Sequence, residues 1–479
     1  MSQSLVRNSF FNVVYQLLNV LFPLVTAPYV ARILLPDNVG KVAVAQNWAQ
    51  YFIVFAALGI PTYAIRETAK SKHDSRELNK TFTELFLLNF VSTSICLILY
   101  IVMILSFQNF RDNLLLYLAV GSGILFNYIT IDWLYQGLED YGYIALRSFV
   151  VKILSLMSLL IFVRSQNDYV VYALISACAI GCNNILNVFH LSKIGVHLSF
   201  KRLSFINHLK PIMIFLANSI TVKLYTLINV TLLGILSTDA AAAFYTNSDK
   251  VVRLIVATIS AIGGVLLPRF SVYAQRGEKE KCADVASKVF HILFFLFVPT
   301  SLGLILMSKE IVLILFGSQY AASIPTLQIM SLLLFSLGFN GLFGTILLAF
   351  GHERENLLCP IAGALTCLIF NFALIPTLAQ NGAAIACVAA ESVVTCVAVF
   401  FSSRIIKLHF RADTIAKTII AAIGMGAIVM VFKLLIHNLV LCLLASVGFG
   451  MLCYIVLSWC MHNPELYQLL TIVKRRQKQ

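Results

Sequence analysis

Residues 211–270 read PIMIFLANSITVKLYTLINVTLLGILSTDAAAAFYTNSDKVVRLIVATISAIGGVLLPRF, two apolar stretches joined by a short loop. Lys223 falls twelve residues into the first stretch, which is about 18 Å along a helix at ~1.5 Å per residue. That depth is near the middle of a hydrocarbon layer about 30 Å thick, too far in for easy snorkelling. The stretch therefore predicts a pair of membrane spans with charge inside the protein.

The second stretch also carries charge. Asp249 and Arg253 are four residues apart and Lys250 and Arg253 are three apart, so all three can share one helix face. Unpaired charge facing lipid costs several kcal/mol, so these groups should face protein or water. Two interpretations stay open. Either they line a wet, cationic cavity for an anionic passenger, or Asp249 neutralises Arg253 while Lys223 pairs with a carboxylate elsewhere.

The composition indicates a polytopic membrane protein. The chain of 479 residues is 59% hydrophobic and 12% charged, with a mean hydropathy of +0.88. A soluble domain carries about a quarter charged residues. The eleven Cys lie mostly in apolar stretches, so we interpret them as small packing residues, neither metal ligands nor disulfide partners.

The hydropathy pattern predicts an all-α chain with about fourteen transmembrane helices. The expected spans are 11–31, 42–64, 82–106, 114–135, 146–163, 170–192, 211–236, 244–268, 287–307, 324–350, 357–377, 384–402, 415–432 and 439–460.

Loop charges predict the orientation. The loops after even-numbered spans, taken with both termini, hold 25 Lys and Arg, whereas the opposite loops hold six. The positive-inside rule therefore places both termini in the cytoplasm. The net charge of +14 is explained by topology, and no nucleic-acid partner is expected.

The sequence has no HExxH, GxSxG, Walker A or paired CxxC pattern. No loop exceeds roughly twenty residues, which leaves no room for a soluble catalytic domain. We therefore expect a protein that is not an enzyme and has no cofactor or metal site.

The stretch IDWLYQGLEDYGYIALRS at 131–148 concentrates aromatic and charged residues. It is interpreted either as an interface belt with an ion pair from Glu139 or Asp140 to Arg147, or as a cytoplasmic gate of Trp133, Glu139 and Arg147. Asp132 is a further carboxylate there.

Two carboxylates could take part in coupling. Asp132, at a span end, and Glu391, inside the twelfth span, could titrate or pair with Lys223 or Arg253. Either is a candidate coupling-ion or ion-pair residue, together with Asp249.

A coarse repeat relates residues 11–80 to residues 211–284. Each runs as span, outer loop with an Asp, span, Pro and basic loop. Two parallel repeats of this kind suit a transporter with a central cleft. Pro61 and Pro268 are interpreted as helix ends or hinges.

Five stretches together resemble a known family. They are FPLVTAPYVARILLPDNVGKVAVAQ, YAIRETAKSKHDSRELNKTFTEL, IDWLYQGLEDYGYIALRS, FYTNSDKVVRLI with LLPRFS, and FGSQYAASIPTLQIMSLLLFSLGF with ILLAFGHEREN. In order and spacing they resemble the polysaccharide transporters of the multidrug/oligosaccharidyl-lipid/polysaccharide exporter superfamily, and the Wzx-type flippases of O-antigen repeat units most of all.

The resemblance implies two six-helix bundles around a central cavity, working by alternating access. The bundles would be residues 1–205 and 206–408, and residues 409–479 would add two helices and a basic cytoplasmic tail. The implied passenger is an undecaprenyl-pyrophosphate-linked oligosaccharide, carried to the periplasmic face of a bacterial inner membrane. Implied partners are membrane lipids, a polysaccharide polymerase and glycosyltransferases.

The implied passenger gives the cationic residues a role. Lys223, Lys250 and Arg253, with Arg32 as a fourth, would bind the pyrophosphate in a low-dielectric cleft. The chain departs from the family pattern at two places. Leu34-Leu35-Pro36 stands where Leu-Gly-Pro is usual, and Asn229 stands where Asp is frequent.

Three other functions are considered. A cation-coupled multidrug exporter of the same superfamily should have a cavity rich in carboxylates. A membrane-embedded polymerase or acyltransferase should have a large outer loop or a catalytic His/Asp set. A peptidoglycan-precursor flippase differs only in its passenger.

Overall fold

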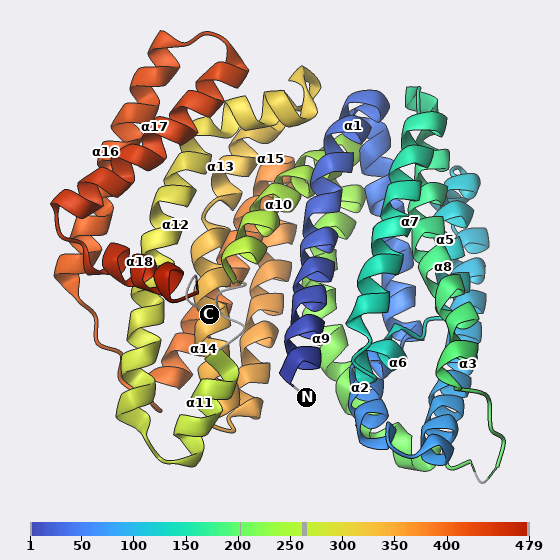
Figure 1. The fold of residues 1–479 in the computed structure, drawn as a ribbon. Coiled ribbons are helices and arrows are strands. Elements are labelled where there is room, and N and C mark those ends of the chain that lie inside the picture. Colours follow the sequence, from blue (N-terminus) through green and yellow to red (C-terminus); the bar gives the residue numbers. More distant parts are fainter. Residues whose placement is uncertain (1, 202, 261–265, 477–479) are drawn as a thin grey trace. The chain divides into compact units, whose positions relative to one another are not determined.

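The computed structural model describes residues 2–201, 203–260 and 266–476, and within these ranges every regular element is a helix (Figure 1). The chain forms two compact units, Met1–Ala243 and Phe244–Gln479, called here the first and second unit. In Figure 1 the first unit runs from blue to green and the second from yellow-green to red.

The first unit is organised around one long helix. α1 packs against α3, α5, α7, α8 and α9, so it contacts most of its unit. The helices of this unit are α1 (Ser2–Ala56), α2 (Ile60–Ser71), α3 (Ser75–Ser106), α4 (Gln108–Arg111), α5 (Leu114–Asn127), α6 (Asp132–Gly137), α7 (Tyr141–Phe162), η1 (Gln166–Asp168), α8 (Tyr169–Ile194) and α9 (Ile206–Leu236).

The second unit contains nearly all of α10 and has α12 as its most connected helix, packed against α13, α14, α16 and α17. Its elements are α10 (Asp239–Ser260), α11 (Leu266–Gln275), α12 (Lys279–Phe316), η3 (Ser318–Ser323), α13 (Ile324–Met330), α14 (Leu333–Ala349), α15 (Glu353–Ser403), α16 (Ala412–Leu435), α17 (Leu439–Cys460) and α18 (Pro464–Arg476).

The fold class is confirmed. Eight described helices are long and apolar enough to cross a membrane, and nine if the bent pair Val25–Ala56 and Ile60–Ser71 is one span. Shorter apolar helices, Leu114–Asn127, Ile206–Ala217 and Thr226–Leu236, coincide with predicted spans four and seven. α10 is not among these helices, since three charged residues interrupt it. The division into bundles at 205/206 and 408/409 stays a prediction.

Two long helices each contain two predicted spans joined by a sharp break. α1 breaks at Leu35 (φ 64°, ψ 166°) and α15 breaks at Ala379 (φ 47°, ψ −125°). Pro36 explains the first break, because proline has no N–H and disfavours the helical conformation of the residue before it. The predicted turns between spans one and two and between spans eleven and twelve are therefore present, although they are only one residue long.

Pro61 begins a helix and does not end one. It lies in the first turn of α2, after Gly59 in a left-handed conformation (φ 72°). α2 is bent by 40° from the preceding helix. Proline suits a first helical turn because its missing N–H would have no partner there. Pro268 lies in α11, and residues 261–265 before this helix are outside the described part of the chain, so its interpretation as a helix end or hinge stays a prediction.

α18 is a helix in the segment that was predicted to be a basic tail. Its apolar residues Leu466 and Leu469 pack with a core cluster of α12, α16 and α17, around Phe295 and Tyr454. Tyr454 donates a hydrogen bond from its hydroxyl to the Phe295 carbonyl at 2.7 Å. The two C-terminal helices are thus tied to α12 in the second unit.

Candidate functional site

The charged residues of α10 form an ion pair within one helix face. Arg253 Nε donates to both oxygens of Asp249, at 2.8 and 2.7 Å. The Arg253 side chain is still 40% exposed, so the pair is neither fully buried nor free in solvent. The expected pairing of these two residues is therefore present. Whether they also bind a passenger stays a prediction.

Lys250 lies beside this pair. Its Nζ donates to Asn247 Oδ1 at 3.3 Å, and Asn247 itself is buried. With Asp249, Lys250 and Arg253 charged, these three residues leave their part of α10 with one positive charge in excess. An excess positive charge among neutral amides suits an anionic ligand.

α15 brings a buried carboxylate near the same helix. Tyr245 of α10 hydrogen-bonds Cys387, which also interacts electrostatically with Asp249, Arg253 and Glu391. Glu391 is buried and interacts with Cys367 as well. Glu391 and the α10 charges thus share Cys387 as an electrostatic neighbour. The pairing of Glu391 with Lys223 or Arg253 and its coupling role stay predictions.

The other two predicted cations belong to the first unit. Lys223 is exposed on α9, where its carbonyl accepts a hydrogen bond from the Thr226 hydroxyl at 2.9 Å. Arg32 is exposed on α1, three residues before the break. Lys250 and Arg253 belong to the second unit, so a cavity shared by all four cations stays a prediction.

Arg147 pairs with Asp132, and the expected pairing with Glu139 or Asp140 was wrong. Arg147 Nη1 donates to Asp132 Oδ1 at 2.9 Å, and its side chain is only 2% exposed. Asn187 of α8 completes the network, accepting from Arg147 and donating to Asp132. Asp132 is therefore occupied here, which corrects the alternative that it pairs with Lys223 or Arg253.

The reason lies in the turn between α6 and α7. Glu139 adopts φ 63°, which reverses the chain, and Asp140 caps α7 by accepting from the Tyr143 N–H at 3.3 Å. α7 therefore returns alongside α6 and brings Arg147 beside Asp132. Glu139 instead lies near Lys72, whose Nζ is 3.6 Å from Glu139 Oε2, on the turn between α2 and α3.

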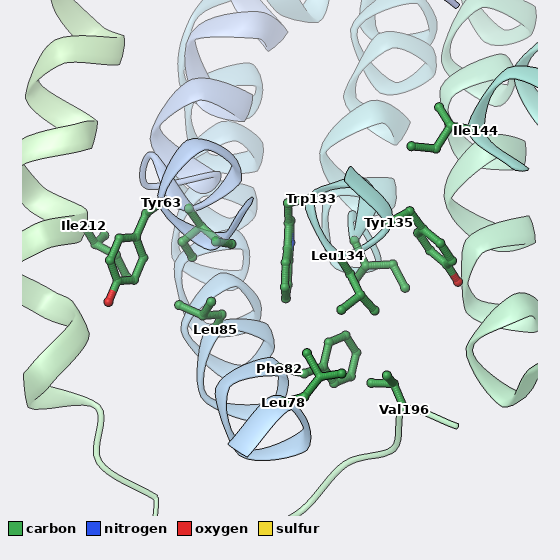
Figure 2. Close-up of a cluster of buried hydrophobic side chains, with 13 residues drawn as sticks. Tyr63, Leu78, Phe82, Leu85, Trp133, Leu134, Tyr135, Ile144, Val196 and Ile212 are labelled. Atoms are coloured by element: carbon green, nitrogen blue, oxygen red, sulfur yellow. The ribbon is translucent and has the colours of Figure 1, made fainter. Parts of the chain in front are cut away.

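Trp133 belongs to a buried core and not to an interface belt. It is 2% exposed and its ring centroid lies 5.8 Å from that of Phe82. Figure 2 shows it among side chains from α2, α3, α7 and α9, which include Tyr63, Leu85, Ile144 and Ile212. Of the three predicted gate residues, two are thus buried and one is on an exposed turn.

A second buried polar network was not predicted. His208 contacts Glu84 through Nε2 at 2.8 Å and Tyr63 through Nδ1 at 2.7 Å. Glu84 also accepts from the Ser204 N–H. The network joins α2, α3 and α9. No sequence pattern predicts this network, because its members are far apart in the chain and dispersed His residues form no motif.

The second unit contains an apolar cavity of about 540 Å³. Its walls come from α12, α16, α17 and α18, with Ile255 from α10, and include Phe295, Met307, Met425, Met451 and Leu469. Polar side chains contribute little to it. No group of three or more His, Cys, Asp and Glu that could hold a metal is found in the described part of the chain.

The model of the family described as "Polysaccharide biosynthesis protein" matches residues 5–274, which include the first unit, α10 and α11. The chain belongs to this polysaccharide biosynthesis protein family. The prediction of a polysaccharide transporter family is thereby confirmed. The charged face of α10 and both networks of the first unit lie within the matched region, whereas the apolar cavity is mostly beyond it.

Relatives of this family member are named as transporters. The "Putative O-antigen transporter" of Escherichia coli (strain K12) is 25% identical over 405 residues, covering 83% of this chain and 96% of that protein. The protein of the same name from Shigella dysenteriae is 24% identical over 363 residues, covering 74% of this chain and 89% of that one.

Two solved structures share the fold of this polysaccharide biosynthesis protein. The lipid II flippase MurJ in an inward closed conformation superposes with a TM-score of 0.74 at 14% identity, covering 95% of this chain and 98% of that one. An inward-facing multidrug resistance MATE family transporter gives 0.64 at 14% identity, covering 83% and 94%. At such identity the likeness concerns the fold alone.

Proposed function

We propose that this protein is a flippase for a lipid-linked oligosaccharide, an undecaprenyl-pyrophosphate carrying an O-antigen or similar repeat unit. It would move the unit from the cytoplasmic to the periplasmic face of the inner membrane. Family membership and relatives named as O-antigen transporters support this function. The observation that carries it is the net positive charge of the Asp249, Lys250 and Arg253 group on α10, inside a helical membrane protein.

The pyrophosphate would bind at this charged face. Arg253 uses its Nε–H for Asp249, and a guanidinium has further N–H donors on its terminal nitrogens. Those donors and the Lys250 ammonium can bind phosphate oxygens without breaking the ion pair. Charge-assisted hydrogen bonds of this kind are about twice as strong as neutral ones. Lys223 and Arg32 are proposed as further contacts.

The apolar cavity of the second unit suits the isoprenoid part of the substrate. Its volume of about 540 Å³ and its Phe, Met and Leu walls fit a hydrocarbon segment better than a sugar. The charged headgroup would cross near α10 while the chain stays in an apolar environment. The headgroup and the isoprenoid chain would thus bind at different places. The two C-terminal helices α16 and α17, which form two walls of the cavity, would contact the isoprenoid chain.

The remaining predictions belong to the same proposal. Residues 1–205 and 206–408 would rock as two bundles between inward-open and outward-open states, with residues 409–479 attached. Both termini would be cytoplasmic, and Glu391 would be the coupling carboxylate. Trp133, Glu139 and Arg147 would form the cytoplasmic gate. A polymerase would act on the delivered units, and glycosyltransferases would build them.

The function is tested by deleting the gene and complementing it. Wild type should restore surface polysaccharide, whereas Lys250→Ala and Arg253→Ala, at normal membrane levels, should leave lipid-linked units facing the cytoplasm. Lys223→Ala and Arg32→Ala test the two cations of the first unit. Lys281→Ala is the matched control, since Lys281 pairs with Glu278 on an exposed turn.

Three outcomes are informative. Loss of polymer with accumulated units supports the flippase. Normal polymer in the deletion strain would overturn it and favour a drug exporter of similar fold. Full rescue by every Ala variant would keep the function but reduce the α10 charges to a structural ion pair.

A further inference from the structure

The first unit contains a second cavity, of about 620 Å³, at one end of its helices. It lies where α3 ends and α5 begins, beside the end of α9 and the first residue of α10. This end is opposite the basic loop 66–80, which the charge distribution places in the cytoplasm. In the proposed topology the cavity therefore opens on the periplasmic side.

Two glycines hold the helices that frame this cavity in close contact. A Cβ on Gly40 would overlap the carbonyl oxygen of Asp239, and a Cβ on Gly234 would lie 2.8 Å from both methyls of Val44. Asn47 adds a hydrogen bond to the Leu227 carbonyl at 2.8 Å. α1 and the end of α9 are thus fixed together, so the cavity is preformed.

Three aromatic side chains form one wall. The centroids of Trp48 and Phe110 are 5.5 Å apart at an interplanar angle of 77°, and those of Phe110 and Tyr117 are 4.9 Å apart at 75°. Because consecutive rings are nearly perpendicular, the three rings differ in orientation along this wall. A flat aromatic face suits a flat apolar ligand surface.

Polar groups complete the lining. Asn109 and Asn113 contribute amides from the segment between α3 and α5, and Lys41 and Asp239 contribute opposite charges that interact with each other. The Lys41 ammonium also lies 5.8 Å from the centre of the Tyr169 ring. The cavity therefore offers donors and acceptors of both kinds, next to aromatic faces.

The ligand classes differ in how they match this lining. A hydrocarbon chain would offer no partner to the Asn109 and Asn113 amides and would desolvate the Lys41 and Asp239 charges, which is costly once water is excluded. A diphosphate would meet the Asp239 carboxylate, which disfavours it. A pyranose ring has an apolar C–H face and a rim of hydroxyls that both donate and accept. The volume lies within the range of small-molecule sites.

We propose that this cavity is a pyranose-binding subsite that holds a sugar of the glycan headgroup on the periplasmic side. The proposal rests on the flippase function, because that function supplies the glycan. The aromatic wall stacks on the sugar ring, and Asn113 and Asp239 hydrogen-bond its hydroxyls. The subsite retains the headgroup after crossing and makes its return less frequent.

The test measures sugar binding directly. The chain has three tryptophans, so Trp133→Phe with Trp459→Phe leaves Trp48 as the fluorescent reporter in the cavity. The protein is placed in lipid nanodiscs, since maltoside and glucoside detergents carry competing sugars. The probe is the repeat-unit oligosaccharide of the host's own surface polysaccharide, released from its lipid by mild acid.

A saturable change in Trp48 fluorescence is expected. Asn113→Ala and Asp239→Asn should each weaken binding about tenfold, the usual effect of losing one or two hydrogen bonds to a bound ligand. The matched control is the protein with Trp459 as its only tryptophan, on the exposed surface of α17, which should not respond.

The results separate the two proposals. Absence of a saturable change, or an equal change in the Trp459 protein, overturns the subsite. An unchanged affinity in both Asn113→Ala and Asp239→Asn does so as well. The flippase function is judged by the complementation experiment alone, so it can survive the loss of the subsite. If the flippase fails and sugar binding is found, the cavity is a sugar site of another activity.

Discussion

The break in α1 makes a prediction about backbone strain. Leu35 adopts φ 64° and ψ 166°, a region that is essentially restricted to glycine. A residue with a Cβ held there costs about 1–3 kcal/mol. Glycine removes this strain but costs ~0.5–1 kcal/mol more entropy on folding. At position 35, glycine should therefore be about 1 kcal/mol more favourable than alanine.

The comparison of Leu35→Gly with Leu35→Ala isolates the backbone contribution at position 35, since both variants lose the same partly buried side chain beyond Cβ. At ~2–4 °C per kcal/mol for a unit of this size, the Gly variant should melt a few degrees above the Ala variant. The assay measures the apparent melting temperature of the purified protein. Samples are heated, and the protein that stays in solution is quantified by size-exclusion chromatography.

A helical position supplies the control. Leu118 lies in the middle of α5 and is half exposed, so Leu118→Gly should melt below Leu118→Ala by the same few degrees, the ordinary helix preference. If alanine is better than glycine at both positions, the strain at Leu35 does not exist and the explanation of the break is wrong. The usual Leu-Gly-Pro of the family fits the predicted preference.

Three further outcomes follow from contacts in the structure. Gly40→Ala should sharply lower the membrane level of the protein, because its Cβ meets the backbone of Asp239, whereas Gly341→Ala has open space and should be tolerated; immunoblots of membranes decide this. Arg147→Met should destabilise by ~1–3 kcal/mol, because it leaves the half-buried Asp132 carboxylate with Asn187 but without its cation, and Asp132→Asn in the same protein should restore much of the loss of melting temperature. Burial raises the pKa of Glu465 from its usual 4.5 to about 7, with Arg411 and Lys288 acting in the opposite direction. The docking of α18 should therefore be strongest at low pH and weaken as the pH rises through about 7; Glu465→Gln should remove this dependence, as measured by trypsin cleavage in α18 at pH 6 and pH 8. Equal cleavage of wild type at both values would contradict it.

The sequence predicted the helical membrane fold because apolar length is a local property. The breaks were harder to predict. The stretch Leu34-Leu35-Pro36 indicates an interruption, but nothing in it says that one residue suffices to reverse α1. At Ala379 there is even less signal, since the break comes three residues after Pro376. Such breaks depend on how the flanking helices pack against their neighbours, and a hydropathy pattern carries no information about that packing.

The partner of Arg147 shows the limit for candidate sites. Three carboxylates, Asp132, Glu139 and Asp140, lie within fifteen residues of it, and sequence distance favoured the nearer two. The left-handed turn at Glu139 places Arg147 beside Asp132, the most distant of the three in sequence. Asn187, which also contacts Arg147, belongs to another helix. In contrast, the pairing of Asp249 with Arg253 was predictable, because four residues on a helix fix the geometry.

The ion pair on α10 has a consequence for transport. Two unpaired cations would be costly in a membrane interior, and Asp249 lowers that cost while no substrate is bound. Because Arg253 contacts Asp249 only through Nε, a diphosphate can bind the outer N–H groups and Lys250 without displacing the carboxylate. In the proposed flippase, the site would then change from net positive to net negative on binding. Asp249 would repel the bound diphosphate, which would limit affinity and favour release on the far side. The Asp249 carboxylate would therefore lower the electrostatic cost of the empty site and also keep the occupied site from binding the diphosphate too tightly to release it.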